Sequence, residues 1–305
     1  MKLPTNRIIE GDVFTVTKTL PTDSVDCIIT SPPYFRLRNY QVDGQLGLEP
    51  HVDQWVAELR GLARELHRVL KPSGTFWLNL GDSYSTHPRE GAPRKSLLGA
   101  PERLLLALVE DGWTIRNKII WAKTNPMPTS VRDRLSTTHE FVYLLTKQPR
   151  YYFDLNAIRE PHRSRPPNRY DPARPSKYAT GTPALGPNSD GDNGLRALKA
   201  RGLVGHPLGK NPGDVWHLAT AHYKEAHFAT FPETLVRRML RASCPPGGLV
   251  LDPFMGAGTT AVVAEAEGRD WLGIELNPAF IRQAEARLTT ARRARKQPPK
   301  RKEVT

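Results

Sequence analysis

The chain contains short runs of apolar residues of the kind that form buried strands. Each run is rich in Val, Ile, Leu or aromatic residues and is bounded by Gly, Pro, Asp or Lys. This composition, with these breakers, is typical of strands. The runs predict strands at residues 7–12, 25–34, 74–82, 114–123, 140–147, 249–254 and 271–276.

Between these runs, apolar residues recur three and four positions apart, which is the period of an amphipathic helix. The pattern is clearest at 53–70, where Lys71-Pro72 ends it. It predicts helices at residues 13–20, 53–70, 98–110, 232–243 and 278–293, with one more after the turn that follows the 249–254 strand. Because strands and helices alternate, we expect an α/β sheet with helices on both faces.

One long segment, residues 160–210, breaks this pattern. It is rich in Pro, Gly, Asn and Ser and has no sustained helix or strand period. A segment of this length without elements is a long insertion or a small irregular subdomain.

The basic charge of the chain is concentrated in two segments. The 305 residues include 44 Lys and Arg against 31 Asp and Glu, a formal net charge of +13. Residues 159–210 carry 10 basic and 4 acidic side chains, and residues 292–305 carry 7 and 1. An excess of this kind favours an acidic partner, nucleic acid first. The second segment reads as a disordered tail that binds phosphates without sequence preference.

In the first basic segment, Tyr170 and Tyr178 are interleaved with basic side chains. A solvated linker is one interpretation of this composition. The other is a nucleic-acid contact surface that orders on binding. The candidate DNA-binding residues are Arg163, Arg165, Arg169, Arg174 and Lys177.

The sequence also excludes several classes of protein. No apolar run approaches the roughly 18–20 residues of a membrane span, and the first residues lack the apolar stretch and cleavage site of a signal peptide. Cys27 and Cys244 are too few for a disulfide framework or a cysteine-based zinc site. We therefore expect a cytosolic protein without a membrane partner or a metal site.

The segment 249–268 has the features of a cofactor-binding turn. A buried strand ends at Asp252, Gly256 and Gly258 follow, and a helix begins. Glycines let a ligand approach the backbone, and free amides at a helix start favour a negative group. Glu275, at the end of the next strand, can accept hydrogen bonds from both ribose hydroxyls of a nucleoside. A carboxylate at Asp252 suits the ammonium of an amino acid better than a pyrophosphate, which favours S-adenosylmethionine over NAD.

The sequence Thr-Ser-Pro-Pro-Tyr at 30–34 follows the second strand. Two prolines there are also an ordinary stop signal. The chemistry of these residues nevertheless suits methyl transfer to an exocyclic amino group of a base. The lone pair of that group is delocalised into the ring, and its protons need hydrogen-bond acceptors during transfer. Ser31 Oγ and the carbonyl of Pro32 can accept them, since proline fixes φ and has no competing N–H. Tyr34 offers a flat face on which an extruded base can stack.

Together, TSPPY at 30–34 and DPFMGAGTT at 252–260 resemble the amino-methylating DNA methyltransferases of the β class. That family places the catalytic motif before the target-recognition region and the cofactor motif after it. Three further blocks agree with it: EGD at 10–12, KPSGTFWLNLGD at 71–82 and AHFATFPETLV at 226–236.

The resemblance implies a Rossmann-like methyltransferase fold with a mixed seven-stranded sheet, one antiparallel strand and a circularly permuted motif order. An irregular target-recognition region would be inserted into it. The implied divisions are a catalytic half at 1–150, the target-recognition insertion at 151–224, a cofactor-binding half at 225–291 and a basic disordered tail at 292–305.

The resemblance also assigns roles to residues. Glu275 would hold the ribose, Asp12 would meet the adenine amino group, and Thr230 would lie near the methionine tail. The implied catalytic residues are Ser31, Pro32, Pro33 and Tyr34. The implied cofactor-binding residues are Asp12, Thr230, Asp252, Pro253, Phe254, Gly256, Gly258, Thr259, Glu275 and Asn277.

Family members with Ser at the first position of this tetrapeptide mostly methylate cytosine N4, and those with Asp mostly adenine N6. Ser31 therefore favours N4-methylcytosine, with adenine N6 as the alternative. Methylation of cytosine C5 needs a cysteine nucleophile after a proline, and neither Cys27 nor Cys244 stands in that context. A non-catalytic DNA-binding relative, and an enzyme acting on RNA or on a protein glutamine, are more distant alternatives.

The expected partner is double-stranded DNA. The resemblance also allows a cognate restriction endonuclease acting on the same site, and a homodimer. The expected setting is the cytoplasm of a bacterium, with a bacterial or phage gene and association with the nucleoid.

Overall fold

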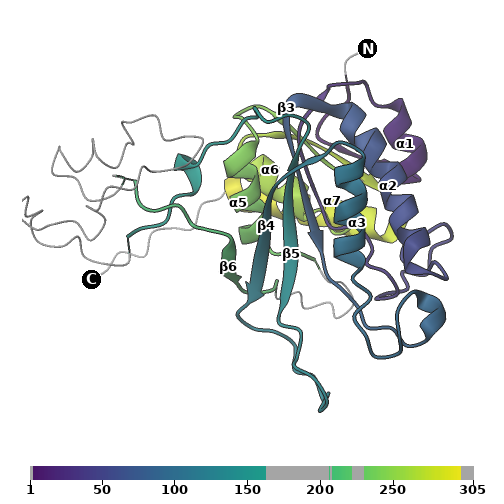
Figure 1. Ribbon diagram of the computed structural model, residues 1–305. Helices are drawn as coiled ribbons and strands as arrows, with labels where there is room; N and C mark the ends of the chain where they lie inside the picture. Colours follow the sequence, from purple (N-terminus) through teal and green to yellow (C-terminus); the bar gives the residue numbers. More distant parts are fainter. Residues whose placement is uncertain (1–2, 163–205, 207, 222–229, 297–305) are drawn as a thin grey trace, which may run out of the picture. The chain divides into compact units, whose positions relative to one another are not determined.

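A computed structural model describes residues 3–162, 206, 208–221 and 230–296 of the chain. These residues form two units (Figure 1), one from 1–154 with 214–305 and one from 155–213. The candidate DNA-binding residues Arg163, Arg165, Arg169, Arg174 and Lys177 lie outside the described residues.

The first unit is built on an eight-stranded sheet with the strand order β1-β8-β7-β2-β3-β5-β4-β6. The strands are β1 Arg7–Glu10, β2 Val25–Thr30, β3 Leu70–Leu80, β4 Thr114–Lys123, β5 His139–Thr146, β6 Val215–Leu218, β7 Leu249–Asp252 and β8 Asp270–Glu275. β5 runs antiparallel to both of its neighbours, and all other paired strands are parallel. The single antiparallel strand agrees with the sequence-based expectation.

The number of strands does not agree, because the sequence predicts seven. The additional strand is β6, which follows the insertion and pairs with β4 in the register Ile120↔Val215. It has only four residues, with Trp216 buried and Val215 exposed. An edge strand this short has too few residues to show a clear period, so the sequence pattern does not predict it.

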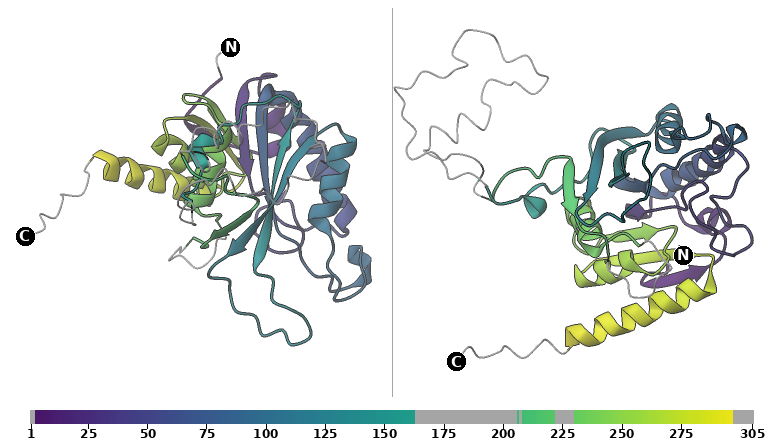
Figure 2. Two further views of the ribbon diagram at one scale, coloured as in Figure 1. Left: turned by 60° about the vertical axis from the view of Figure 1, so that its left-hand side comes forward. Right: turned by 90° about the horizontal axis from the view of Figure 1, so that it is seen from below.

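Helices cover both faces of the sheet (Figures 1 and 2). They are α1 Val13–Thr19, α2 Val52–Val69, α3 Ala100–Glu110, α5 Glu233–Ser243, α6 Thr259–Ala266 and α7 Pro278–Lys296. α2 packs against α1 and α3, and α6 packs against α5 and α7. The α/β class with helices on both faces is therefore confirmed.

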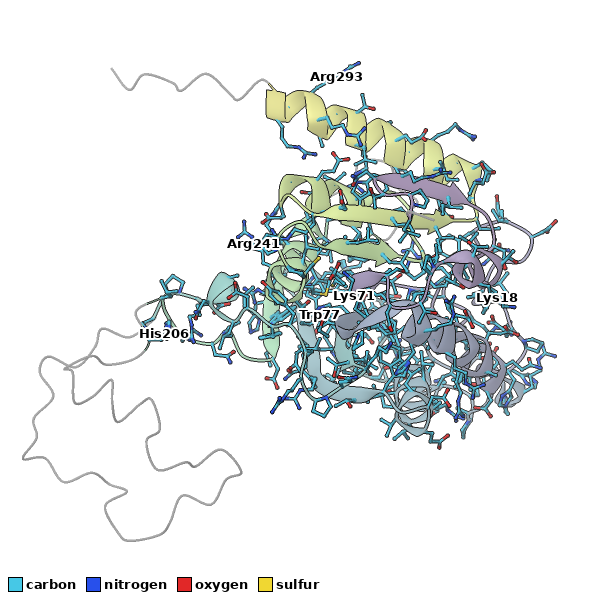
Figure 3. The ribbon with its side chains drawn as sticks, turned by 90° about the horizontal axis from the view of Figure 1, so that it is seen from above. Lys18, Lys71, Trp77, His206, Arg241 and Arg293 are labelled. Atoms are coloured by element: carbon cyan, nitrogen blue, oxygen red, sulfur yellow. The ribbon has the colours of Figure 1, made fainter. Side chains whose placement is uncertain are left out.

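Burial of one apolar stripe holds each helix on the sheet. In α2 the stripe contains Trp55, Leu59, Leu62 and Leu66, each at most 5% exposed, at the spacing that the sequence predicts. On the other face, Trp77 of β3 points into the interior (Figure 3) and donates a hydrogen bond of 2.6 Å to Ser243 of α5.

The last helix corrects the expected position of the C-terminal tail. α7 continues to Lys296, so residues 292–296 are helical and the predicted disordered tail does not begin at 292. Arg292 and Arg295 both form ion pairs with Glu265 of α6. Arg293 lies exposed on the outer side of α7 (Figure 3).

In the second unit, the described residues form a short 3-10 helix at Asn156–Ile158 and a backbone pair between two distant positions. Glu160 and Lys210 exchange two backbone hydrogen bonds of 3.0 and 2.8 Å. A Cβ on Gly209 would stand 2.1 Å from the Glu160 carbonyl, so this pairing requires a glycine there. The pair brings together the two ends of the segment that the sequence predicts as an insertion.

Candidate active site

A cavity opens at the carboxyl ends of four parallel strands. Its volume is about 1040 Å³, including its solvent-filled mouth. Ligands of open α/β sheets bind at this edge. The predicted cofactor residues that line the cavity are Asp12, Thr230, Pro253, Phe254, Gly256, Thr259, Glu275 and Asn277.

Glu275 ends β8 and is held by backbone amides on both of its oxygens. Gly256 N–H donates to Oε2 over 2.7 Å, and Asn277 N–H donates to Oε1 over 2.8 Å. Burial raises the pKa of Glu275 above its usual value, against the opposing effect of these hydrogen bonds. Each carboxylate oxygen can accept more than one hydrogen bond. The fixed carboxylate can therefore still accept from a ribose placed in the cavity.

Asp12 lies at the cavity and also begins α1. Its Oδ1 accepts from the amide and the hydroxyl of Thr15, at 3.0 and 3.1 Å. This is an N-cap, which fixes the direction of the side chain. Oδ2 accepts no hydrogen bond from the described residues and is available to a donor such as a base amino group.

Asp252 does not line the cavity, contrary to the expectation that it meets the ammonium of the cofactor. It is 1% exposed and accepts hydrogen bonds from Thr30 at 2.7 Å, Thr260 at 2.6 Å and the amide of Phe254 at 3.1 Å. Burial raises its pKa to about 7. The carboxylate thus ties β2, β7 and α6 together behind the cavity wall.

Gly258 is also absent from the cavity lining. It has φ of +77°, and a Cβ added to it would stand 2.8 Å from the Cβ of Ala284 in α7. The turn and the close approach of α7 therefore both require a glycine at this position.

The Thr-Ser-Pro-Pro-Tyr turn follows β2 at the same edge. Ser31 and Pro33 line the cavity, whereas Pro32 and Tyr34 do not. The Pro33 carbonyl accepts a hydrogen bond of 2.9 Å from Trp55 Nε1. The Pro32 carbonyl accepts none from the described residues, so Ser31 Oγ and this carbonyl remain as acceptors.

Tyr34 is joined to a group that the sequence did not single out as functional. Its hydroxyl accepts from Ser31 Oγ at 3.1 Å and donates to Glu140 Oε2 at 2.7 Å. Lys123 Nζ and Asn79 Nδ2 also donate to Glu140, at 2.5 and 3.0 Å. Glu140 thus belongs to the site region although it does not line the cavity.

A second group that sequence reasoning missed covers the cavity. Tyr40 and Phe280 both line it, and their rings meet edge to face with centroids 6.0 Å apart. Val42, Gln45 and Leu46, from the loop between β2 and α2, line it as well. The aromatic and aliphatic members of this group suit a flat aromatic ligand.

Cys27, Cys244 and Asp82 have structural roles. Cys27 is buried, and burial raises its pKa to about 12; Cys244 is also buried with a raised pKa. Neither is an activated thiolate. Asp82 caps α3 by accepting from the amides of Gly99 and Ala100. Within the described residues, no group of three or more His, Cys, Asp or Glu is arranged to hold a metal ion.

The described part of the chain also contains no helix with the length and apolar character needed to cross a membrane.

The fold and the cavity define an α/β enzyme that binds a nucleoside-type ligand at the edge of its sheet. The family model described as DNA methylase, which is named for N6 and N4 methyltransferases, matches residues 25–286. The chain belongs to this family and is a DNA methyltransferase.

Curated relatives agree over almost the whole chain. Type II methyltransferase M.Cfr9I of Citrobacter freundii is 38% identical over 302 residues, covering 92% of this chain and 87% of its own length. Type II methyltransferase M.SmaI of Serratia marcescens is 36% identical over 307 residues, covering 94% and 91%.

Solved structures show the same fold. PvuII DNA methyltransferase, described as cytosine-N4-specific, has a TM-score of 0.58 at 21% identity, covering 94% of this chain and 91% of its own. The complex of M1.HpyAVI with SAM has a TM-score of 0.51 at 20% identity, covering 92% and 99%. The α/β methyltransferase fold is thereby confirmed.

Proposed function

We propose that the chain transfers a methyl group from S-adenosyl-L-methionine to the N4 atom of cytosine in double-stranded DNA. The observation that carries the proposal is the position of Ser31 in the wall of the cavity that holds Asp12 and Glu275. An acceptor for amino-group protons therefore shares one cavity with the carboxylates expected to hold a nucleoside.

The residues present fit this cofactor. Glu275 offers carboxylate oxygens to the ribose, Asp12 offers Oδ2 to the adenine amino group, and Phe254 and Phe280 offer apolar surface to the ring. Thr230, to which the family resemblance gives a role near the methionine tail, lines the same cavity. When bound, S-adenosylmethionine supplies an electrophilic methyl group.

The target base would be extruded from the duplex, with its amino group directed at Ser31 Oγ and the Pro32 carbonyl. These acceptors hold the amino protons while the nitrogen becomes pyramidal, which makes its lone pair available. The face of Tyr34 is proposed as the surface on which the base stacks. No nucleophile of the protein is needed, in keeping with the buried and protonated Cys27 and Cys244.

Cytosine is favoured over adenine by Ser31 at the first position of the tetrapeptide. The similarity to a cytosine-N4-specific enzyme supports the same choice. Adenine N6 methylation is the alternative within the family.

The division of labour along the chain is part of the proposal. Residues 1–150 and 225–291 would supply catalysis and cofactor binding, and 151–224 would recognise the target through basic residues such as Arg163 and Arg169. The type II methyltransferases among the relatives favour a cognate restriction endonuclease for the same site. We further propose that the chain forms a homodimer and that it is located in the cytoplasm, in association with the nucleoid.

The experiment is transfer of labelled methyl from S-adenosylmethionine to duplex DNA by the full chain and by Ser31→Ala. We expect label in DNA with the wild type and a loss of at least about 100-fold with Ser31→Ala, while cofactor binding stays within about twofold. Full activity of Ser31→Ala would contradict the role of its hydroxyl. Cofactor binding without methylation of any DNA would contradict the function.

A further inference from the structure

The hydroxyl of Ser31 stands at one end of a continuous line of hydrogen bonds that leads away from the cavity. Ser31 Oγ donates to the Tyr34 hydroxyl over 3.1 Å, and this hydroxyl donates to Glu140 Oε2 over 2.7 Å. Only Ser31 of these three residues lines the cavity. The line therefore connects a substrate-facing acceptor, Ser31, to a carboxylate that lies 106 residues after Tyr34 in the sequence.

The carboxylate fixes the direction of every bond in the line. An ionised carboxylate can only accept, so the Tyr34 hydroxyl must donate to Glu140. The Tyr34 oxygen is then left to accept, and Ser31 must donate to it. Because its proton is engaged in this way, Ser31 presents lone pairs to the cavity, as an acceptor of amino-group protons must.

Two donors hold Glu140 in place from the sheet. Lys123 Nζ lies 2.5 Å from Oε1, and Asn79 Nδ2 lies 3.0 Å from Oε2. The side chains of Lys123 and Glu140 are only 22% and 17% exposed, so the pair is partly shielded from water. Charge-assisted bonds of this kind are stronger than neutral ones.

The backbone also leaves room for this arrangement. A Cβ on Gly81, just after β3, would stand 2.9 Å from Tyr34 Cε2 and 3.5 Å from Glu140 Cγ. A glycine at this position thus lets the Tyr34 ring lie where its hydroxyl reaches Glu140. Burial and the Glu140 charge raise the pKa of Tyr34 well above its usual value, which keeps the phenol protonated as a donor.

We infer that Glu140 is a positioning residue that orients the Ser31 hydroxyl through Tyr34 and receives the proton released by methyl transfer. This inference rests on the proposed amino methylation, but on neither base in particular. As the new N–C bond forms and the S–C bond of the sulfonium breaks, the amino nitrogen must lose one proton. That proton passes to Ser31 Oγ, the Ser31 proton to the Tyr34 oxygen, and the Tyr34 proton to Glu140.

The test compares Glu140→Gln, Tyr34→Phe and the double variant under single-turnover conditions with saturating S-adenosylmethionine and duplex DNA. Tyr34→Phe keeps the ring for stacking and removes only the hydroxyl. Each single variant should lower the methylation rate constant by about 100-fold. The dissociation constants for DNA and cofactor should stay within about twofold. The double variant should be no slower than Tyr34→Phe, because Glu140 acts only through Tyr34.

The matched control is Glu102→Gln, which breaks an ion pair of 2.7 Å between α3 and Lys118 of β4 that lies outside the line. It should leave the rate within about twofold. A Glu140→Gln rate near that of the wild type, or independent losses that multiply in the double variant, would overturn the inference. If Glu140→Gln does not fold, an unchanged rate in Tyr34→Phe overturns it.

The base that the wild type methylates separates the two proposals. Methylated adenine would contradict the proposed function, while the relative rates of the variants would still decide the role of Glu140.

Discussion

The amide of Gly256 donates a hydrogen bond of 2.7 Å to Oε2 of Glu275. This bond joins the turn after β7 to the end of β8, the two adjacent strands whose tips form the cofactor side of the cavity. The turn and the carboxylate are therefore a single preformed unit. Ligand binding needs no rearrangement of the glycine turn to bring the carboxylate into place.

Glu275→Gln should disrupt this unit. Its amide NH₂ would have to face the N–H of either Gly256 or Asn277, and it would offer the ribose one acceptor oxygen fewer. The loss of hydrogen bonds to a charged group corresponds to about 1.5–3 kcal/mol. We expect calorimetry to show S-adenosylmethionine binding weakened by about 10–100-fold. Glu10→Gln is the control, because Glu10 is the exposed register partner of Glu275 on β1. Equal affinities of wild type and Glu275→Gln would contradict the assigned role.

Asp252 should make the stability of the free protein depend on pH. Burial raises its pKa from 3.8 to about 7 in the folded state. Between about pH 4 and 7 the folded protein therefore keeps a proton that the unfolded chain has lost, and the free energy of unfolding falls as pH rises. The difference in the free energy of unfolding between Asp252→Asn and the wild type should therefore rise by up to about 4 kcal/mol, in favour of the variant, across this window.

Urea unfolding without cofactor from pH 4.5 to 8 measures this difference. Asp133→Asn removes an exposed carboxylate that is paired with Lys95. Its curve of unfolding free energy against pH should run parallel to that of the wild type. If the Asp252→Asn curve is also parallel, Asp252 is not the group responsible.

Gly81→Ala should impair catalysis more than stability. Its new Cβ would lie 2.9 Å from the Tyr34 ring, so the ring must move and its hydroxyl must leave Glu140. We expect the single-turnover rate to fall by about tenfold or more. Gly61→Ala in α2, where a Cβ meets nothing within 4 Å, should keep the rate and stabilise the fold by about 0.5–1 kcal/mol. Equal single-turnover rates for Gly81→Ala and Gly61→Ala would show that the position of Tyr34 does not depend on the space beside Gly81.

The segment 297–305 should contribute to DNA affinity and not to sequence preference. It contains Lys300, Arg301 and Lys302, and its removal leaves α7 and the pairs of Glu265 with Arg292 and Arg295 intact. Deletion should reduce the magnitude of the slope of log affinity against log salt concentration by up to about 3. Replacing the three basic residues by Gln, at full length, should give the same slope. A changed target preference in either variant would assign this segment to recognition.

Much of the fold follows from local patterns in the sequence. The stripe of α2 and the apolar β2 and β7 strands each contain their own period and their own breakers. The cofactor turn likewise shows itself locally, since Gly256 and Glu275 stand at fixed places relative to two adjacent strands.

What the sequence did not reveal depends on pairing between distant segments. Glu140 reaches Tyr34 only because β5 pairs antiparallel with β3, and Lys123 joins it from the neighbouring strand β4. Pairing β4 with β5 as antiparallel neighbours is the signal that leads to Glu140. This pairing sets Trp121 opposite Glu140 and so brings Lys123 close to the glutamate. The burial of Asp252 behind the cavity depends on Thr30 and Thr260, which no local pattern links to it.

The central claim, transfer to cytosine N4, is tested most directly by mass analysis of nucleosides from duplex DNA methylated by the wild-type chain. We expect N4-methyldeoxycytidine, with a yield at least about 100-fold lower from DNA treated for the same time with Ser31→Ala. N6-methyldeoxyadenosine as the methylated product, or no methylated nucleoside at all, would contradict the claim.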